Sequence, residues 1–179
     1  MRRLMLLRHS KTENDAPSGR DEDRRLDDRG RLDAAEIGRW IAGHPPFPDC
    51  VKVSPAVRSQ QTWDIAWEAM KDLVPAPAVE FVPALYGADP AALLQVIHDA
   101  GNDIQRLMLV GHNPGMHEAA FMLAGDGSAA ARAALADNLP TSGLAVIDFA
   151  IAEWRDVSFR AGKLSLFVSP KLLKAASGG

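Results

Sequence analysis

The chain has 179 residues, of which 47% are hydrophobic and 24% are charged, a composition that predicts one folded domain and excludes a disordered chain. The formal net charge of −3 does not favour binding to nucleic acid or to an anionic membrane surface. The one cysteine, Cys50, excludes an internal disulfide, and the apolar run after Met1 is too short for a secretory signal. We therefore expect a single domain over residues 1–179, located in the cytoplasm, with no nucleic-acid or membrane partner.

Apolar runs and proline positions predict alternating strands and helices in the first half of the chain. A strand begins near Leu4 and ends at Leu7. The polar stretch from Lys11 to Arg31 predicts a loop that overhangs the end of this strand, with its Asp and Arg side chains facing solvent. The elements expected next are a helix over about 32–42, a strand over 50–53, a helix opened by Ser54 and Pro55 that ends near residue 72, and a strand over 79–82.

The second half continues the alternation. The expected elements are a helix over 90–100 capped by Asp89, a strand over 107–110, a helix that opens at 113–114, an alanine-rich helix over 127–137, strands over 144–149 and 164–168, and a paired segment over 154–159 between those two strands. This order predicts an α/β fold in three layers, with a mostly parallel central sheet and helices on both faces. Because the last strands follow one another without a helix, we expect at least one antiparallel edge.

Two of the predicted strands end in a histidine. Arg8 and His9 follow the first strand, and His112 follows the strand over 107–110. The carboxyl ends of parallel strands meet at one edge of the sheet, where α/β proteins bind their ligands. A guanidinium fork suits phosphate, and an imidazole nitrogen can act as a nucleophile near neutral pH. Arg58 stands about one turn into a helix whose N-terminus offers free N–H groups. These four residues predict a phosphate site.

A metal site is the alternative interpretation of the second histidine. His112 and His117, with Glu118, would be its ligands. Their five-residue spacing places the two histidines on different sides of a helix, and no cysteine or carboxylate cluster completes the set. We therefore expect no metal and no other cofactor.

Taken together, three motifs resemble the histidine phosphatase superfamily, and in particular its small SixA-type phosphohistidine phosphatases: Leu7-Arg8-His9-Ser10, Ser54-Pro55-x-x-Arg58-x-x-Gln61-Thr62 and Gly111-His112-Asn113-Pro114. The resemblance extends from Leu4 to about Phe149. It implies a phosphoglycerate-mutase-like fold, His9 as the phosphorylated nucleophile, and Arg8, Arg58 and His112 as the phosphate pocket. Ser10 departs from the pattern, because much of the superfamily has glycine there, and this sets the chain apart from the mutases.

The charges of these residues predict their protonation. With two arginines nearby, we expect the imidazolium form of His9 to be disfavoured, so that a ring nitrogen is free to attack phosphorus. We expect His112 to be protonated in the transition state and to donate to the phosphoryl group.

A general acid is harder to assign. Many superfamily members carry Glu or Asp shortly after the strand that follows the arginine helix, where this chain has only Asp89, a residue expected to cap a helix. Glu13 and Glu118 are the other candidates. The SixA-type proteins also lack the usual acid. Imidazole is a better leaving group than an alkoxide, so a missing acid favours a phosphoramidate substrate.

The sequence therefore predicts a metal-independent phosphatase that works through a phosphohistidine intermediate and removes phosphate from phosphohistidine on a protein, with a signalling protein as partner. The interval between Arg58 and His112 leaves no room for a large cap, and an open pocket suits a side chain presented by another protein. One alternative is a phosphatase of a small phosphoester, for which Asp89 would be the acid. The other is a non-enzymatic phosphate- or phosphoprotein-binding module, against which the intact His9 argues.

Overall fold

A seven-stranded sheet forms the centre of the protein in the computed structural model, which describes residues 1–178. The strand order is β3-β2-β4-β1-β6-β7-β5. The strands are β1 (Arg2–Arg8), β2 (Cys50–Val53), β3 (Ala78–Phe81), β4 (Arg106–Gly111), β5 (Ala124–Gly127), β6 (Leu144–Phe149) and β7 (Gly162–Val168). Strand β6 runs antiparallel to both of its neighbours, β1 and β7, whereas the other pairs are parallel. The antiparallel strand thus lies inside the sheet and not at the expected edge.

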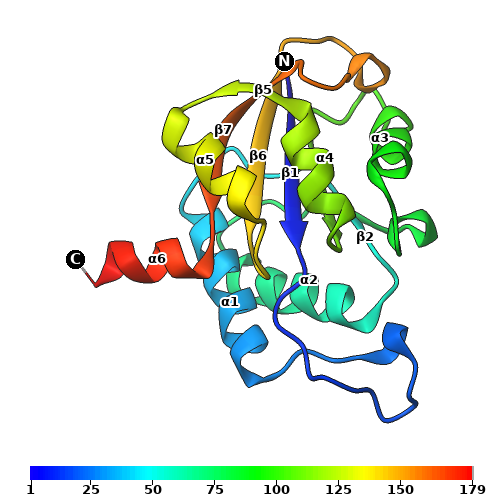
Figure 1. The fold of residues 1–179 in the computed structure, drawn as a ribbon, viewed down its shortest axis with the longest axis vertical. Helices are drawn as coiled ribbons and strands as arrows, with labels where there is room; N and C mark the ends of the chain where they lie inside the picture. The colour runs from blue at the N-terminus through cyan, green and yellow to red at the C-terminus, as the bar shows by residue number, and fades with distance from the viewer. Residues whose placement is uncertain (179) are drawn as a thin grey trace.

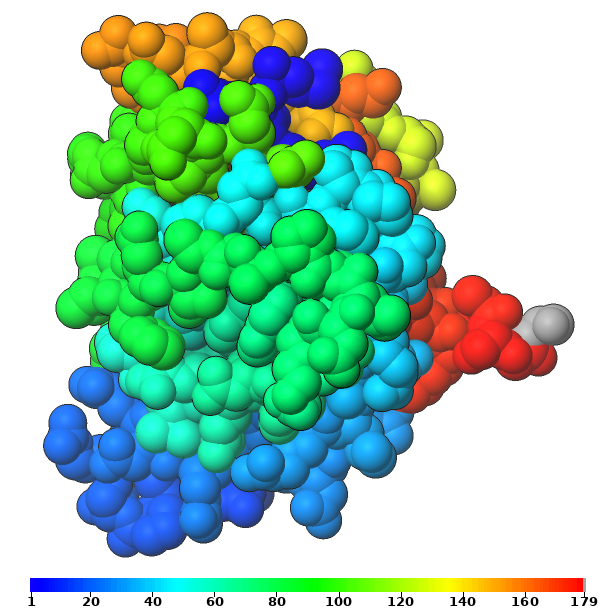
Figure 2. All heavy atoms as spheres, turned by 180° about the vertical axis from the view of Figure 1, so that it is seen from behind, coloured from blue at the N-terminus to red at the C-terminus, as the bar shows by residue number. Residues whose placement is uncertain are grey.

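Helices cover both faces of the sheet, as the alternating pattern predicts (Figure 1). Side chains of α1 (Asp28–Ala42) and α2 (Val57–Met70) pack into one apolar cluster, and those of α3 (Pro90–His98), α4 (Gly115–Leu123) and α5 (Ala129–Asp137) pack into the other. The last helix, α6 (Pro170–Ser177), has no fully buried residue and projects from the side of the body, as the red segment in Figure 2 shows. Within residues 1–178, no helix combines the length and the apolar character needed to cross a membrane.

Helices α1 and α2 begin at other residues than the sequence pattern predicts, as does α5, which begins at Ala129 because Gly127 belongs to β5. Helix α1 begins four residues early because the side chain of Asp27 accepts a hydrogen bond from the Gly30 N–H at 2.7 Å, which caps the helix. Helix α2 begins at Val57, and Ser54 does not cap it. The Ser54 hydroxyl is instead bonded to His112.

Three features of the last third were not predicted correctly. The segment expected to pair over 154–159 forms a short 3₁₀ turn at Trp154–Asp156, because the Trp154 ring is buried and its N–H donates to the Ile104 carbonyl at 2.7 Å. Strand β5 has the sequence Ala-Gly-Asp-Gly, which carries no strand propensity. Helix α6 was not predicted either.

The contact between α1 and α2 depends on a glycine. A Cβ at Gly38 would lie 2.4 Å from the carbonyl oxygen of Ala66. We expect Gly38→Ala to lower the free energy of unfolding by about 1–3 kcal/mol, because the two helices must separate to admit a methyl group. Chemical denaturation measures this change. Gly43→Ala is the matched control at the end of α1, where the nearest atom is 3.6 Å from the new Cβ. Equal losses in the two variants would contradict the close contact.

Candidate active site

The parallel register of β1 and β4 brings the two predicted histidines together. Arg8 pairs with Gly111, so that His9 and His112 are the first residues beyond neighbouring strand ends. The His9 N–H donates to the Gly111 carbonyl at 3.0 Å, and the ring centroids of the two histidines are 5.3 Å apart. Both residues are buried, with 9% and 8% of their surface exposed. The structure therefore brings the two motifs side by side at one end of the sheet.

His9 has the tautomer that a nucleophile needs. Its Nδ1 lies 2.8 Å from the carbonyl oxygen of Ser10, and because a carbonyl only accepts, Nδ1 carries the proton and Nε2 has a free lone pair. Burial is the main reason that the pKa of His9 is lowered to about 3; the hydrogen bond to Ser10 raises the pKa, and electrostatic interactions with His112, Arg58 and Arg8 lower it. The neutral form is as expected, but its main cause is burial and not the arginines.

His112 is oriented by Ser54. The Ser54 hydroxyl oxygen accepts from the Ala56 N–H at 3.3 Å and lies 2.7 Å from Nε2 of His112. Among the described residues Nε2 is the one acceptor within reach of the hydroxyl proton, so we assign the hydroxyl as donor to Nε2. The ring proton is then on Nδ1, which is buried and has no hydrogen-bond partner among the described residues. Burial, together with the charge of Arg58, lowers the pKa of His112 to about 4. His112 is therefore neutral in the free protein at pH 7, and the expected protonation concerns the transition state alone.

A second unpartnered donor belongs to Arg8. Its Nη1 donates to the Leu139 carbonyl at 3.2 Å, whereas its Nε is buried without a hydrogen-bond partner in the described part of the chain. Buried donors are nearly always satisfied in folded proteins, and an exception asks for an explanation. Arg8 precedes His9 in the chain and His112 lies beside it at the neighbouring strand end, and the oxygens of a phosphoryl group would satisfy both the Nε of Arg8 and the Nδ1 of His112.

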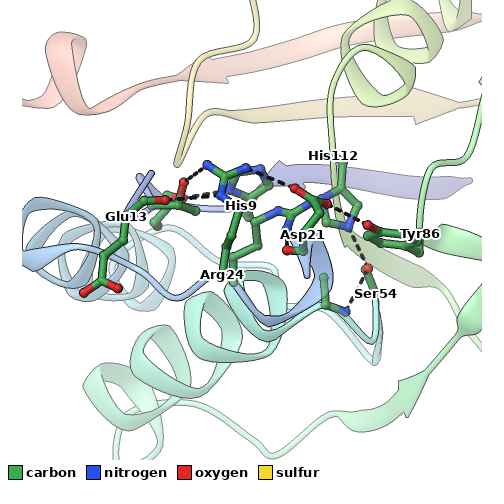
Figure 3. A network of polar contacts seen from close by, with 11 residues as sticks. His9, Glu13, Asp21, Arg24, Ser54, Tyr86 and His112 are labelled. Atoms are coloured by element: carbon green, nitrogen blue, oxygen red, sulfur yellow. Dashed lines mark hydrogen bonds and ion pairs between the residues drawn. The ribbon is translucent and has the colours of Figure 1, made fainter. Parts of the chain in front are cut away.

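Arg58 is held by a residue that the sequence pattern placed in solvent. Its Nη1 donates to the carbonyl oxygen of Asp21 at 2.8 Å, and its Nη2 lies 2.9 Å from Oδ2 of Asp21. The Tyr86 hydroxyl donates to the same Oδ2 at 2.6 Å, and Figure 3 shows Asp21 between Arg24 and Tyr86, beside His112. The hydrogen bond from Tyr86, with those from Arg58 and Arg24, keeps the pKa of Asp21 well below its usual range.

No local pattern identifies Asp21, because its partners Arg58 and Tyr86 are 37 and 65 residues away in sequence. Sequence reasoning missed both Asp21 and Tyr86 for this reason. The only available signal was the length of the polar loop, which indicated that it overhangs the end of β1.

Backbone contacts hold the nucleophile segment in place. The Ser10 N–H donates to the Thr62 hydroxyl at 2.9 Å, and that hydroxyl donates to the Arg58 carbonyl at 2.7 Å. The N–H of Ser142 donates to the carbonyls of both Arg8 and His9, at 3.2 and 3.1 Å. Ser142 adopts a positive φ of 59°, a strained backbone conformation that proteins keep chiefly at functional sites. The Ser10 hydroxyl, the departure from the glycine pattern, is hydrogen-bonded to the Ser142 hydroxyl.

Comparison with known proteins agrees with this geometry. The model of the histidine phosphatase superfamily (branch 1) matches residues 4–82. A structure from Agrobacterium tumefaciens, solved under the provisional name phosphohistidine phosphatase SixA, is 32% identical with a TM-score of 0.78, and the match covers 94% of this chain and 98% of that one. This chain belongs to the histidine phosphatase superfamily.

Two further relatives of this histidine phosphatase cover nearly its whole length. A structure from Nakamurella multipartitia with the same provisional name has a TM-score of 0.80 and 27% identity, and covers 94% of this chain and 96% of that one. An uncharacterized protein of Mycobacterium tuberculosis is 34% identical over 170 residues, which are 92% of this chain and all of the relative. The expected phosphoglycerate-mutase-like fold is confirmed, and membership of the superfamily makes this protein a phosphatase.

The three candidate acids of this phosphatase lie in different places. Asp89 caps α3 by accepting from the Ala92 N–H at 2.8 Å, and Glu13 pairs with Arg25 at 3.5 Å in the exposed loop. Glu118 lines a cavity of about 120 Å³ that Asp89 and His112 also line. Glu118 lines the same cavity as His112, and its side chain makes no hydrogen bond or ion pair within residues 1–178. The carboxylates of Asp89 and Glu13 are both engaged.

The alternative metal set does not assemble. Nε2 of His117 lies 2.5 Å from the Leu135 carbonyl oxygen. In the part of the chain that the structure describes, no three His, Cys, Asp or Glu side chains are grouped as metal ligands.

The lowered pKa values of the two histidines predict a pH dependence of stability. The folded protein keeps His9 and His112 neutral down to about pH 3 and 4, whereas the unfolded chain binds protons on both near pH 6.5. The free energy of unfolding should therefore fall as the pH drops from 6.5 to 5, by up to about 1.4 kcal/mol per pH unit for each histidine. Denaturant unfolding at pH 7, 6 and 5 measures the slope. His9→Ala should make it shallower, and an unchanged slope would contradict the neutral, buried imidazole.

Proposed function

We propose that this phosphatase removes the phosphoryl group from phosphohistidine on another protein, through a phosphohistidine intermediate at His9. The observation that carries the proposal is the state of His9. Its Nδ1–H is fixed on the Ser10 carbonyl, its Nε2 has no hydrogen bond within residues 1–178, and the neighbouring Arg8 and His112 each have a buried donor without a partner in that range. A site that only binds phosphate needs the donors but not the free nucleophile.

The reaction has two balanced steps. In the first, the lone pair on His9 Nε2 forms a bond to phosphorus, and the bond from phosphorus to the substrate nitrogen breaks with its electron pair going to that nitrogen. In the second, water attacks the phosphorus on His9, the bond to Nε2 breaks, and inorganic phosphate leaves. Donors from Arg8, Arg58 and His112 stabilise the equatorial oxygens in both steps. We propose that these three residues supply the required positive charge without a metal ion.

The carboxylates around the pocket favour a phosphoramidate substrate. An alkoxide leaving group needs a proton, but Asp21 is held ionised and Asp89 is engaged as a helix cap. Imidazole leaves without such an acid. Between α2 and β4 the chain adds only β3, a short turn at Pro83–Leu85 and α3, so the pocket has no large cap. The similarity to the Agrobacterium tumefaciens protein also supports this substrate. The partner that the proposal implies is a phosphohistidine-bearing signalling protein in the cytoplasm.

A small phosphoester is the second candidate substrate, and the position of Glu118 favours it. This carboxylate lines the cavity beside His112, and its side chain has no bond to another described residue. If the protein hydrolyses phosphoesters, Glu118 is the candidate that remains to protonate the alkoxide.

The test compares substrates and two histidine variants. The purified protein, with EDTA present, is incubated with a protein phosphorylated on histidine and, separately, with phosphoserine and p-nitrophenyl phosphate. We expect rapid loss of phosphate from histidine, and His9→Ala should lower that rate at least about 1,000-fold because it removes the nucleophile. His44→Ala is the control, since His44 is exposed and stacks on Trp40 outside the pocket. A labelled intermediate on His9 should be stable to alkali and labile to acid.

Other outcomes would redirect the assignment. Faster turnover of phosphoserine, lost in Glu118→Gln, would replace the phosphohistidine substrate with a phosphoester. Loss of activity in EDTA that added metal restores would overturn the metal-free mechanism. Tight binding of phosphoprotein without turnover would favour a binding module.

A further inference from the structure

Asp21 is a partly exposed carboxylate bonded directly to Arg58 of the candidate phosphate site. In an in-line displacement the leaving group is opposite the attacking atom, and His9 attacks from the buried side of the pocket. Asp21 belongs to the 3₁₀ turn Asp21–Asp23, in the loop that overhangs the end of β1, and 52% of its side chain is exposed. Asp21 is bonded to Arg58 and to the Tyr86 hydroxyl, and the centroid of the Tyr86 ring is 5.5 Å from that of His112. These contacts hold Asp21 between Arg24 and Tyr86, beside His112 (Figure 3).

The hydrogen bonds of Asp21 leave part of its carboxylate free. Oδ2 accepts from Arg58 Nη2 and from the Tyr86 hydroxyl, and Oδ1 accepts from Arg24 Nη1 at 3.2 Å. A carboxylate has about four lone-pair sites, so one site on Oδ1 remains for a donor of the substrate. Three donors fix the orientation of the carboxylate, which therefore accepts a further hydrogen bond at little entropic cost.

We propose that Asp21 determines specificity for phosphohistidine by accepting a hydrogen bond from the N–H on the non-phosphorylated nitrogen of the substrate imidazole. This inference rests on the proposed function and adds the residue that recognises the leaving group. The carboxylate favours the ring form that carries this proton. When the bond from phosphorus to nitrogen breaks, its electron pair goes to that nitrogen, the proton stays on the other nitrogen, and neutral imidazole leaves.

The same carboxylate disfavours phosphoesters. Tyr86, Arg58 and Arg24 keep the pKa of Asp21 so low that it has no proton to give to an alkoxide. An ionised carboxylate beside a developing alkoxide also repels it. Asp21 thus discriminates between two leaving groups, one with an N–H to donate and one that must be protonated.

The test uses two small substrates with Asp21→Asn. In this variant the amide oxygen retains the bonds to Arg58 and Tyr86, and the amide nitrogen replaces Oδ1. We expect kcat/KM for phosphoimidazole to fall about 10-fold or more, because a donor now faces the ring N–H, whereas kcat/KM for p-nitrophenyl phosphate should not fall, because the variant also removes the charge that repels the departing phenolate. Tyr86→Phe should produce a smaller loss with the same selectivity. Asp23→Asn is the matched control, because Asp23 is in the same turn and its carboxylate bonds only to Ser18 among the described residues.

A methylated substrate separates recognition from the positioning of Arg58. Phosphoimidazole with a methyl group on its second nitrogen cannot donate, so wild type and Asp21→Asn should hydrolyse it at similar rates. Equal losses on phosphoimidazole and p-nitrophenyl phosphate would overturn the inference and leave Asp21 a positioning residue for Arg58. If wild type hydrolyses p-nitrophenyl phosphate but neither phosphoimidazole nor phosphohistidine, the proposed function itself fails, and the inference falls with it.

Discussion

The parallel pairing of β1 with β4 is the constraint on which the rest of the site depends. Its register places Arg8 beside Gly111, so that the chain leaves both strands at the same level and His9 and His112 follow side by side. A shift of one residue would turn one of these side chains to the opposite face of the sheet. The apolar residues that fix the register, Leu4 to Leu7 and Leu107 to Val110, are almost fully buried. Core packing and the position of the nucleophile are therefore set by the same interaction.

Burial gives the pocket its chemistry and also its energetic cost. Removing His9 from water keeps its nitrogen available at neutral pH, and the same burial leaves donors on Arg8 and His112 without partners among the residues that the structure describes. An unsatisfied buried donor costs about 1–3 kcal/mol. A bound phosphoryl group removes that cost, so part of the substrate affinity comes from strain already present in the free protein. Arg58 does not carry this desolvation cost at Nη1 and Nη2, because Asp21 accepts hydrogen bonds from both nitrogens.

The sequence predicted those parts of the structure that depend on local patterns. Buried strands such as β2 and β6 are short apolar runs, and their bounds agree with the prediction because burial alone selects the residues. The strand-end positions of His9 and His112 followed from the same runs. The predicted start of helix α1 lies four residues after the observed one. The first turn of this helix is polar and is stabilised by the Asp27 cap, and hydrophobic periodicity does not detect such a turn. The contact between Asp21 and Arg58 joins an exposed loop to a helix, and no spacing rule connects them. Site residues on regular elements were therefore predictable, and those on the loop were not.

The antiparallel direction of β6 determines which part of the chain must be synthesised before Arg8 and His9 are held in position. Because β6 runs against β1, the segment that precedes it reaches the same end of the sheet as His9, and there Leu139 and Ser142 contact Arg8 and the nucleophile backbone. Leu139 and Arg8 are 131 residues apart in sequence. A chain synthesised only as far as His112 already carries all four side chains that we propose for the phosphate site, yet it lacks the residues that hold Arg8 and His9 in position. Contacts of such long range form late in folding. We therefore expect the nascent protein to be inactive until the segment that contains Leu139 and Ser142 has been made and packed against β1.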